Sequence, residues 1–479
     1  MRQFVSMIIN SQVVYPERTE YFSPDQMFPE YVHKHISKQP NTVYSMVRES
    51  FVQADLDVEN YGKSCWNPLG KIIKPGSKVF VLCNFVYHRR KDESEKDFFS
   101  KCTHGSMLRA VVDYILIAVG ADGLVRFGNA PLQSCEWSRV LFDTGASRVV
   151  EFYKSFTSSR IEACDLRSYI TRRDALGRVI FVSEENDNSQ VRVDLGENSL
   201  LEELYIGEIK PIFRVTDYDC DGGQNFHADK KHIYIINQKI LDSDVIMSIP
   251  KMKTHEKVGI TLGIKGCVGA VARKECLAHH RYGTPSIGGD EYRSNMFHLN
   301  WLSSFHDYLN RMKQNTYANM LRMVEKSIRT LLRECGFIQA GAWHGNDTAW
   351  RMSVDIARIV KYCDNNGQMS NKERRQHLLL IDGIVGGDHE GPLNPEPVDS
   401  KTILLSSNIV MGDYYGAMLM GFDPMRFPII KECFRIASYP LLDDVLPETK
   451  CIVNGRNVQC GELQGMLKKT YVPSKGWQN

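Results

Sequence analysis

Residues 78–86 read KVFVLCNFV, an apolar run that Asn84 interrupts near its end. Such a run is typical of a β-strand that is buried on both faces. Residues 106–119 then carry apolar side chains at helical spacing and stop at Gly120, and a second short apolar run follows at 124–127. A strand, a helix and a strand of these lengths predict a βαβ unit, and such units build parallel sheets.

Further apolar runs indicate strands at 178–182, 232–236, 243–250, 378–382 and 402–406. We therefore expect an α/β fold with a parallel-rich sheet core and flanking helices. The strand ends near 82–86, 246–250 and 378–382 should lie on one edge of the sheet, because right-handed crossovers bring parallel strands out on the same side. We divide the 479 residues into an N-terminal extension packed on the core (1–74), a first part of the core (75–270), a mostly helical insertion or lid (271–375), a second part of the core (376–450) and a C-terminal tail (451–479).

The composition narrows the class of function. The 59 basic and 57 acidic residues leave a net charge of +2, which gives no global basic field for nucleic acid. No apolar run reaches the ~20 residues of a membrane helix, and no secretory signal pattern is present, so we expect a soluble, cytoplasmic protein without a membrane partner. The 13 Cys form no C-x-x-C pair, which argues against a zinc ribbon and predicts no iron–sulfur cluster.

The most unusual local sequence is the basic segment 250–269, which follows a predicted strand. Lys251, Lys253 and His255 alternate at the carboxyl end of that strand, where open α/β sheets bind ligands, and they suit an anion. Lys265 stands among glycines that allow close approach of a ligand. The segment lacks the Gly-Lys-Ser/Thr ending of a phosphate-binding Walker loop. The alternative interpretation is a solvated basic turn followed by a glycine-rich strand or helix.

Two acidic segments suggest cation sites. In the Gly-rich stretch 382–391, Asp388, His389 and Glu390 can hold a divalent ion such as Mg²⁺ or Mn²⁺ or take part in acid–base chemistry, and Asp382 and Asp413 can join them as metal ligands. The alternative there is a tight turn with solvated carboxylates. Residues 217–222 open like a calcium loop, but position 12 of that loop is Ala228 rather than Glu, so we interpret them as an ordinary turn.

A third cluster, at 341–351, contains two Trp that bracket His344 and Asn346, and it ends in Arg351. The guanidinium of Arg351 can bind a planar anion through two parallel hydrogen bonds. Asp347 or Thr348 can instead serve only as the N-cap of a following helix. The sequence favours neither interpretation.

These motifs together resemble the family named domain of unknown function 362. The resemblance rests on Lys251-Met-Lys-Thr-His255 followed by Lys265, and on Asp382, Glu390-Gly-Pro and Asp413. It covers roughly residues 75 to 430, interrupted by the insertion. The family has no assigned general reaction. Some members carry a ferredoxin-like cluster segment, and this chain departs from them because its Cys are not clustered.

Three hypotheses for the function follow. The first is an enzyme that acts on a small anionic metabolite, phosphorylated or carboxylated, with or without a divalent metal. The second is a non-catalytic protein that binds a phosphorylated or nucleotide ligand, and the third is a nucleic-acid-binding module, against which the net charge speaks. The candidate residues are His255 and Glu390 for catalysis; Lys251, Lys253, Lys265, Asn84, Arg351, His344 and Asn346 for substrate binding; and Asp382, Asp388, Glu390 and Asp413 for a metal.

Overall fold

A computed structural model describes residues 3–156, 160–173, 179–184, 189–208, 210–215, 222–312, 315–334, 337, 340–442 and 450–478. The acidic residues of the calcium-like segment, Asp217 to Asp221, lie outside the described residues. None of the described helices combines the length and the apolar character that crossing a bilayer requires.

The centre of the molecule is a mixed, mostly parallel sheet of 12 strands. Five neighbouring strands run parallel in the order β15 (Gln376–Glu390), β11 (Val245–Ile249), β2 (Lys78–Cys83), β3 (Leu124–Asn129) and β4 (Ile161–Asp165). Ile249 lies opposite Cys83, and Ser248 lies opposite Leu379. The segments 82–86, 246–250 and 378–382 therefore lie side by side, which confirms the α/β fold and the parallel core. β15 does not end at residue 382, however, but continues to Glu390.

Both ends of the chain complete this sheet. β1 (Phe4–Ile9) pairs antiparallel with β17 (Thr402–Ser406), and it pairs parallel with β18 (Lys450–Val453), which β19 (Arg456–Asn457) follows. The segments 1–74 and 451–479, expected as a packed extension and a tail, thus each contribute strands. Their strands are short, and β18 has no long apolar run that marks it in the sequence.

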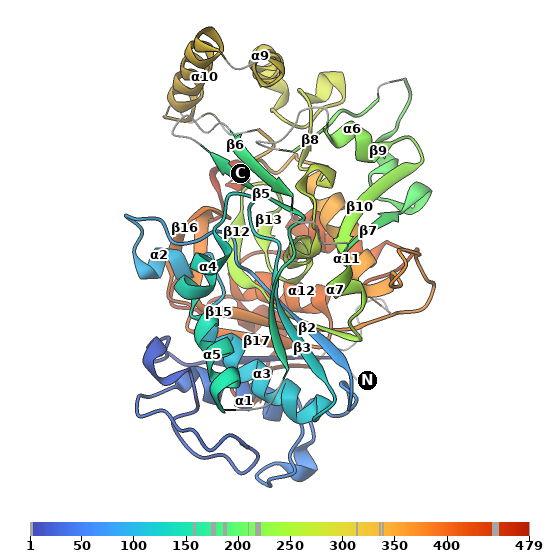
Figure 1. Cartoon of the computed structure of the whole chain (residues 1–479). Coiled ribbons are helices and arrows are strands. Elements are labelled where there is room, and N and C mark those ends of the chain that lie inside the picture. The colour runs from blue at the N-terminus through green and yellow to red at the C-terminus, as the bar shows by residue number, and fades with distance from the viewer. Residues whose placement is uncertain are drawn as a thin grey trace.

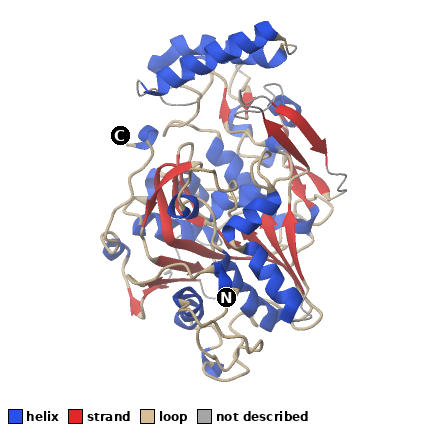
Figure 2. Cartoon of the chain, turned by 60° about the vertical axis from the view of Figure 1, so that its left-hand side comes forward, coloured by secondary structure: helices blue, strands red, loops and turns tan. Residues whose placement is uncertain are grey.

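Helices cover both faces of the sheet (Figures 1 and 2). On the central strands, alternate residues enter two separate cores: Val79 and Val81 pack with one set of helices, and Phe80 and Leu82 with the other. The first set comprises α1 (Thr42–Gln53), α3 (Gly105–Val119), α4 (Trp137–Thr144) and α5 (Ala146–Phe156), and the second α8 (Gly263–Gly266), α11 (Ala349–Tyr362) and α12 (Ile409–Leu419). Burial on both faces explains the continuous apolar runs.

The segment 271–375 is mostly helical, as expected, but its helices differ in their surroundings. α9 (Asn300–Arg311) and α10 (Thr316–Glu334) lie at the top of Figure 1, away from the sheet. α11, in contrast, is buried along its whole length and packs against α8. The end of the segment is therefore part of the core, and only its earlier helices stand apart.

Smaller elements surround this core. The expected strand at 232–236 is β10 (Lys231–Asn237), which pairs with β7 (Gln190–Asp194) and β9 (His227–Ala228) outside the main sheet. The expected strand at 178–182 is β6 (Val179–Glu184), paired with β5 (Tyr169–Arg173). The remaining elements are α2 (Glu95–Phe99), α6 (Gly222–Phe226), α7 (Gln238–Leu241), α13 (Pro428–Lys431), α14 (Cys460–Leu463), β8 (Phe213–Arg214) and β14 (His280–Arg281).

Candidate functional site

The basic segment begins with a strand rather than a loop. After Ile249 and Pro250, the chain continues as β12 (Lys251–His255), all five residues of which are buried. β12 pairs parallel with the second half of β15 and antiparallel with β13 (Gly259–Thr261). The interpretation of a solvated basic turn is therefore wrong, because Lys251 and Lys253 are buried. The alternation of Lys, Met, Lys, Thr and His has the period of a strand.

β12 starts where the winding of the sheet reverses. From β2 the chain proceeds through α3 to β3 on one side, whereas β11 and β15 lie on the other side of β2. The crevice at such a reversal is the usual ligand site of open α/β sheets. Here the Nζ of Lys253 donates hydrogen bonds to the side-chain oxygen of Asn84 (2.9 Å) and to the carbonyl of Lys101 (3.0 Å). Two predicted binding residues, from strands far apart in sequence, therefore meet.

Lys251 has a different environment from Lys253. Its Nζ lies 3.1 Å from Oδ2 of Asp382 and donates to the hydroxyl of Tyr15 (2.8 Å), which in turn donates to Oδ1 of Asp382 (2.6 Å). Lys251 and Asp382 are both fully buried. The ring of Tyr15 stacks on His104 at 4.2 Å, and the backbone N–H of His104 donates to the same carboxylate (3.3 Å). The charges of Lys251 and Asp382 thus neutralise each other, and this pair ties the N-terminal segment to the sheet.

The site contains a group of four lysines and two histidines that we call the lysine cluster: Lys253, Lys257, Lys265, Lys274, His255 and His279. Burial, reinforced by neighbouring lysines, lowers the pKa of Lys253 and of Lys274 to about 7. Burial and the charge of Lys257 lower the pKa of Lys265 to about 8. Lys265 influences the pKa of four other members and so lies at the centre of the cluster.

Among the described residues, Lys253 and Lys274 donate their hydrogen bonds to neutral oxygens and not to carboxylates. Lys274 donates to the carbonyls of Ala130 (2.9 Å) and Val271 (3.5 Å), and Lys253 donates only to the neutral oxygens named above. Lys265 is partly exposed, and within the described parts of the chain its Nζ has no hydrogen-bond or ion-pair partner. The cluster therefore presents positive charge that an anion can neutralise.

His255 lies on the same strand as Lys253 and is 4% exposed. Burial, followed by the charges of Lys265 and Lys253, holds its pKa well below the usual range, so the ring is neutral at neutral pH. Its Nδ1 accepts a hydrogen bond from the backbone N–H of Lys257 (3.0 Å). The proton of the neutral ring therefore sits on Nε2, which makes His255 a hydrogen-bond donor at this site.

The four carboxylates predicted as metal ligands do not form one group. Asp382 pairs with Lys251, and Asp413 accepts hydrogen bonds from the backbone N–H of Gly263 (2.6 Å) and Ile264 (2.9 Å), which anchors the helix that carries Lys265. Burial raises the pKa of Asp413 to about 7 against the effect of those two donors. Glu390 accepts from the backbone N–H of Lys475 (3.0 Å). Each carboxylate therefore has its own structural contact.

Asp388 has the best surroundings for a cation. It is buried, and ligand atoms of Asp388, His389 and Glu396 lie within 4.8 Å of one another. Glu396 belongs to β16 (Asn394–Val398), which pairs with β15, and it was not among the predicted ligands. Oδ2 of Asp388 also lies 3.1 Å from Nζ of Lys469, so a metal ion would compete with this lysine.

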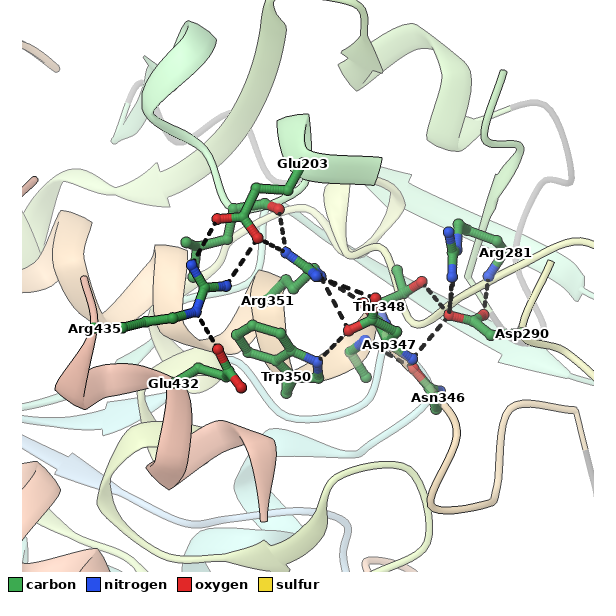
Figure 3. A network of polar contacts seen from close by, with 12 residues as sticks. Glu203, Arg281, Asp290, Asn346, Asp347, Thr348, Trp350, Arg351, Glu432 and Arg435 are labelled. Carbon is green, nitrogen blue, oxygen red and sulfur yellow. Dashed lines mark hydrogen bonds and ion pairs between the residues drawn. The ribbon is translucent and has the colours of Figure 1, made fainter. Parts of the chain in front are cut away.

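Figure 3 shows that two of the predicted binding residues at 341–351, Asn346 and Arg351, belong to a structural network. Arg351 bonds to Glu203 (2.5 Å), to Asp347 (3.1 Å) and to the carbonyl of Leu200 (2.9 Å). The side-chain oxygen of Asn346 accepts from the N–H groups of Thr348 (3.0 Å) and Ala349 (2.9 Å) at the start of α11. The N-cap residue of α11 is Thr348, one of the two residues expected there, but its side chain makes no capping bond, and Asn346 supplies the capping side chain instead.

His344 and Asn346 differ in their surroundings. His344 is exposed, and its Nδ1 lies 3.2 Å from the carbonyl of Gly476. The Nδ2 of Asn346 donates to the carbonyl of His279 (2.9 Å), so it positions a member of the cluster. Sequence reasoning did not select Lys257, Lys274 or His279. Lys257 stands in the basic segment 250–269, which was the available signal, whereas Lys274 stands between Arg273 and Glu275, where nothing sets it apart from an ordinary charged turn.

A comparison with family models places this site within a known family. The model described as domain of unknown function (DUF362) matches residues 173–418, just over half of the chain. The match includes β12, α8, Asp382 and Asp413, whereas Asn84 lies outside it. No curated protein matches the chain.

Proposed function

We propose that this chain, which belongs to the DUF362 family, binds a small anionic metabolite at the lysine cluster and acts on it as an enzyme. The ligand carries phosphate or carboxylate groups. One observation supports the proposal above all: Lys253, Lys265 and Lys274 are cations in buried or partly buried positions, and none has a carboxylate partner within the described parts of the chain.

The lowered pKa values of the lysines support the proposal that an anion binds beside them. A fall of the pKa of Lys253 from 10.5 to about 7 corresponds to a cost of roughly 5 kcal/mol for its charged form. A phosphate or carboxylate in the cluster removes that cost, because an opposite charge within hydrogen-bonding distance stabilises an ammonium group. The bound anion would take the place that a carboxylate side chain has in an ordinary buried ion pair.

The catalytic part of the proposal rests on His255. Its Nε2–H can donate to an oxygen of the bound ligand and stabilise negative charge that develops there during a reaction. Because Nδ1 already accepts from Lys257, the neutral ring has no free acceptor, so we assign His255 the role of donor instead of base. The same geometry suits a non-catalytic binding protein, which is the second candidate function.

A divalent ion such as Mg²⁺ or Mn²⁺ remains part of the proposal. Asp388, His389 and Glu396 offer one nitrogen and two carboxylate ligands, a set that suits Mn²⁺. Asp388 follows Gly387, which pairs with Lys253, so an ion there would lie at the strand that carries the lysines.

Calorimetric titration with pyrophosphate and citrate tests the binding step. We expect the wild-type protein to bind at least one of them, and Lys253→Met and Lys265→Met to weaken binding at least tenfold. Lys71→Met, at an exposed position outside the site, is the matched control and should bind as wild type. Equal affinity of all four proteins would overturn the site, and binding without turnover of any phosphorylated or carboxylated metabolite would favour the non-catalytic protein.

A further inference from the structure

Lys265 differs from the other lysines near the strand ends. Lys251 donates to Tyr15, Lys253 to Asn84 and Lys274 to the carbonyl of Ala130. The Nζ of Lys265 has no acceptor in the described parts of the chain, and the residue is partly exposed. Its amine is therefore the one among these four that a ligand can reach without displacing a hydrogen bond.

The backbone beneath Lys265 is fixed in position. Asp413 accepts from the N–H groups of Gly263 and Ile264, the two residues that precede it. A Cβ on Gly263 would meet Asp413 and Leu379 at 3.0 Å, so the glycine allows this close packing. Lys265 thus projects from a rigid turn, and a reactive group needs such a support if it is to attack a bound substrate at a defined point.

We propose that Nζ of Lys265 condenses with a carbonyl group of an anionic substrate and forms an imine. This inference rests on the proposed function, because the rest of the lysine cluster would hold the carboxylate or phosphate of the same substrate. The substrate class is then a keto acid or a phosphorylated aldehyde or ketone.

The condensation needs no oxidant or reductant. The amine nitrogen attacks the carbonyl carbon and forms a carbinolamine. The C–O bond then breaks, both amine protons leave with the oxygen as water, and a C=N bond remains. The titratable groups around Lys265 are Lys253, Lys257, Lys274, His255 and His279.

The cationic surroundings favour this chemistry. A lysine beside other cations loses its proton more readily, and only the neutral amine is a nucleophile. The pKa of Lys265, lowered to about 8 by burial and by Lys257, leaves a usable neutral fraction near neutral pH. Lys253 and Lys274 also have low pKa values, but their amines point at acceptors, so the free position of Lys265 decides the assignment.

Pyridoxal 5′-phosphate, an aldehyde that carries a phosphate, is a suitable probe. The full-length protein is incubated with the probe, reduced with borohydride and digested, and the labelled peptide is found by mass spectrometry. We expect one dominant label, at Lys265, that excess inorganic phosphate suppresses at least tenfold. Lys265→Arg keeps the cation but cannot form an imine, so it should lose this label and still bind pyrophosphate. Lys71→Arg is the control and should be labelled as wild type.

The outcomes separate the two proposals. Pyrophosphate binding without a label at Lys265, or labelling spread equally over many lysines, overturns the imine and leaves the anion site standing. A wild-type protein that binds neither pyrophosphate nor the probe overturns the proposed function, and the imine with it. If Lys265→Arg does not fold, as judged by circular dichroism, Lys265→Gln takes its place in the labelling test.

Discussion

Anion binding at the lysine cluster should draw protons from solution, and the number should depend on pH. Lys253 and Lys274 have pKa values of about 7 and Lys265 of about 8 in the free protein. A bound anion stabilises the charged ammonium groups and raises these pKa values. Binding must therefore take up protons from solution at any pH at which these lysines are partly neutral in the free protein but charged in the complex.

The pKa values set the size of the effect. In the free protein at pH 8, the protonated fraction is about one-tenth for Lys253 and for Lys274, and about half for Lys265. Full protonation in the complex then takes up about two protons per anion, whereas at pH 6 the uptake is close to zero. Affinity should accordingly be highest below pH 7 and fall by roughly a hundredfold per pH unit near pH 8.

The assay is calorimetric titration with pyrophosphate in buffers of different ionisation enthalpy, at pH 6 and at pH 8. The dependence of the observed heat on the buffer gives the number of protons taken up. Lys274→Met removes one of the groups and should lower the uptake at pH 8 by about one proton. An uptake at pH 8 no larger than at pH 6 would refute the reasoning, because the lysines would then already be charged in the free protein.

Five substitutions extend the test to the rest of the site. Asp382→Asn leaves a buried lysine unpaired and should lower the free energy of unfolding by about 3–5 kcal/mol in urea denaturation. His255→Leu removes the donor and should reduce turnover of a substrate, once found, by about 10²–10³-fold in steady-state kinetics, with pyrophosphate affinity nearly unchanged. Asn346→Ala removes a helix cap and should cost about 1 kcal/mol in the same denaturation assay without loss of pyrophosphate binding, whereas a substrate contact would show the reverse. Glu396→Gln should weaken Mn²⁺ binding, measured by electron paramagnetic resonance, and Glu390→Gln should not; the opposite order would favour the ligand set expected from the sequence.

The sheet could be predicted from the sequence because its signals are local. Strands buried on both faces need continuous apolar runs, and the runs at 78–86, 243–250 and 378–382 became β2, β11 and β15. General rules of α/β topology then put their ends on one edge. The contact of Lys253 with Asn84 follows from the same rules, since each residue lies just beyond the end of a neighbouring parallel strand.

The pairing of charges could not be predicted in this way. Asp382 looked like a metal ligand, but its partners include Tyr15, which lies 367 residues earlier in the chain. Asp413 bonds to backbone groups 150 and 149 residues before it, and Arg351 finds Glu203 through the packing of α11. A charged side chain shows in the sequence, but whether another part of the chain neutralises it depends on the tertiary fold.

That distinction is also the reason to place function at the lysine cluster and not at the other charged residues. Lys251 and Asp382 pair with each other, and Arg351 pairs with Glu203, so folding alone accounts for their positions. Lys253, Lys265 and Lys274 have no such ionic partner among the described residues. Holding each of them in its charged form costs several kcal/mol, whereas the net folding stability of a protein is only about 5–15 kcal/mol. Replacing them with apolar residues of similar size would remove this cost. Their presence together, at the point where the winding of the sheet reverses, is therefore accounted for by an anion that comes from outside the chain.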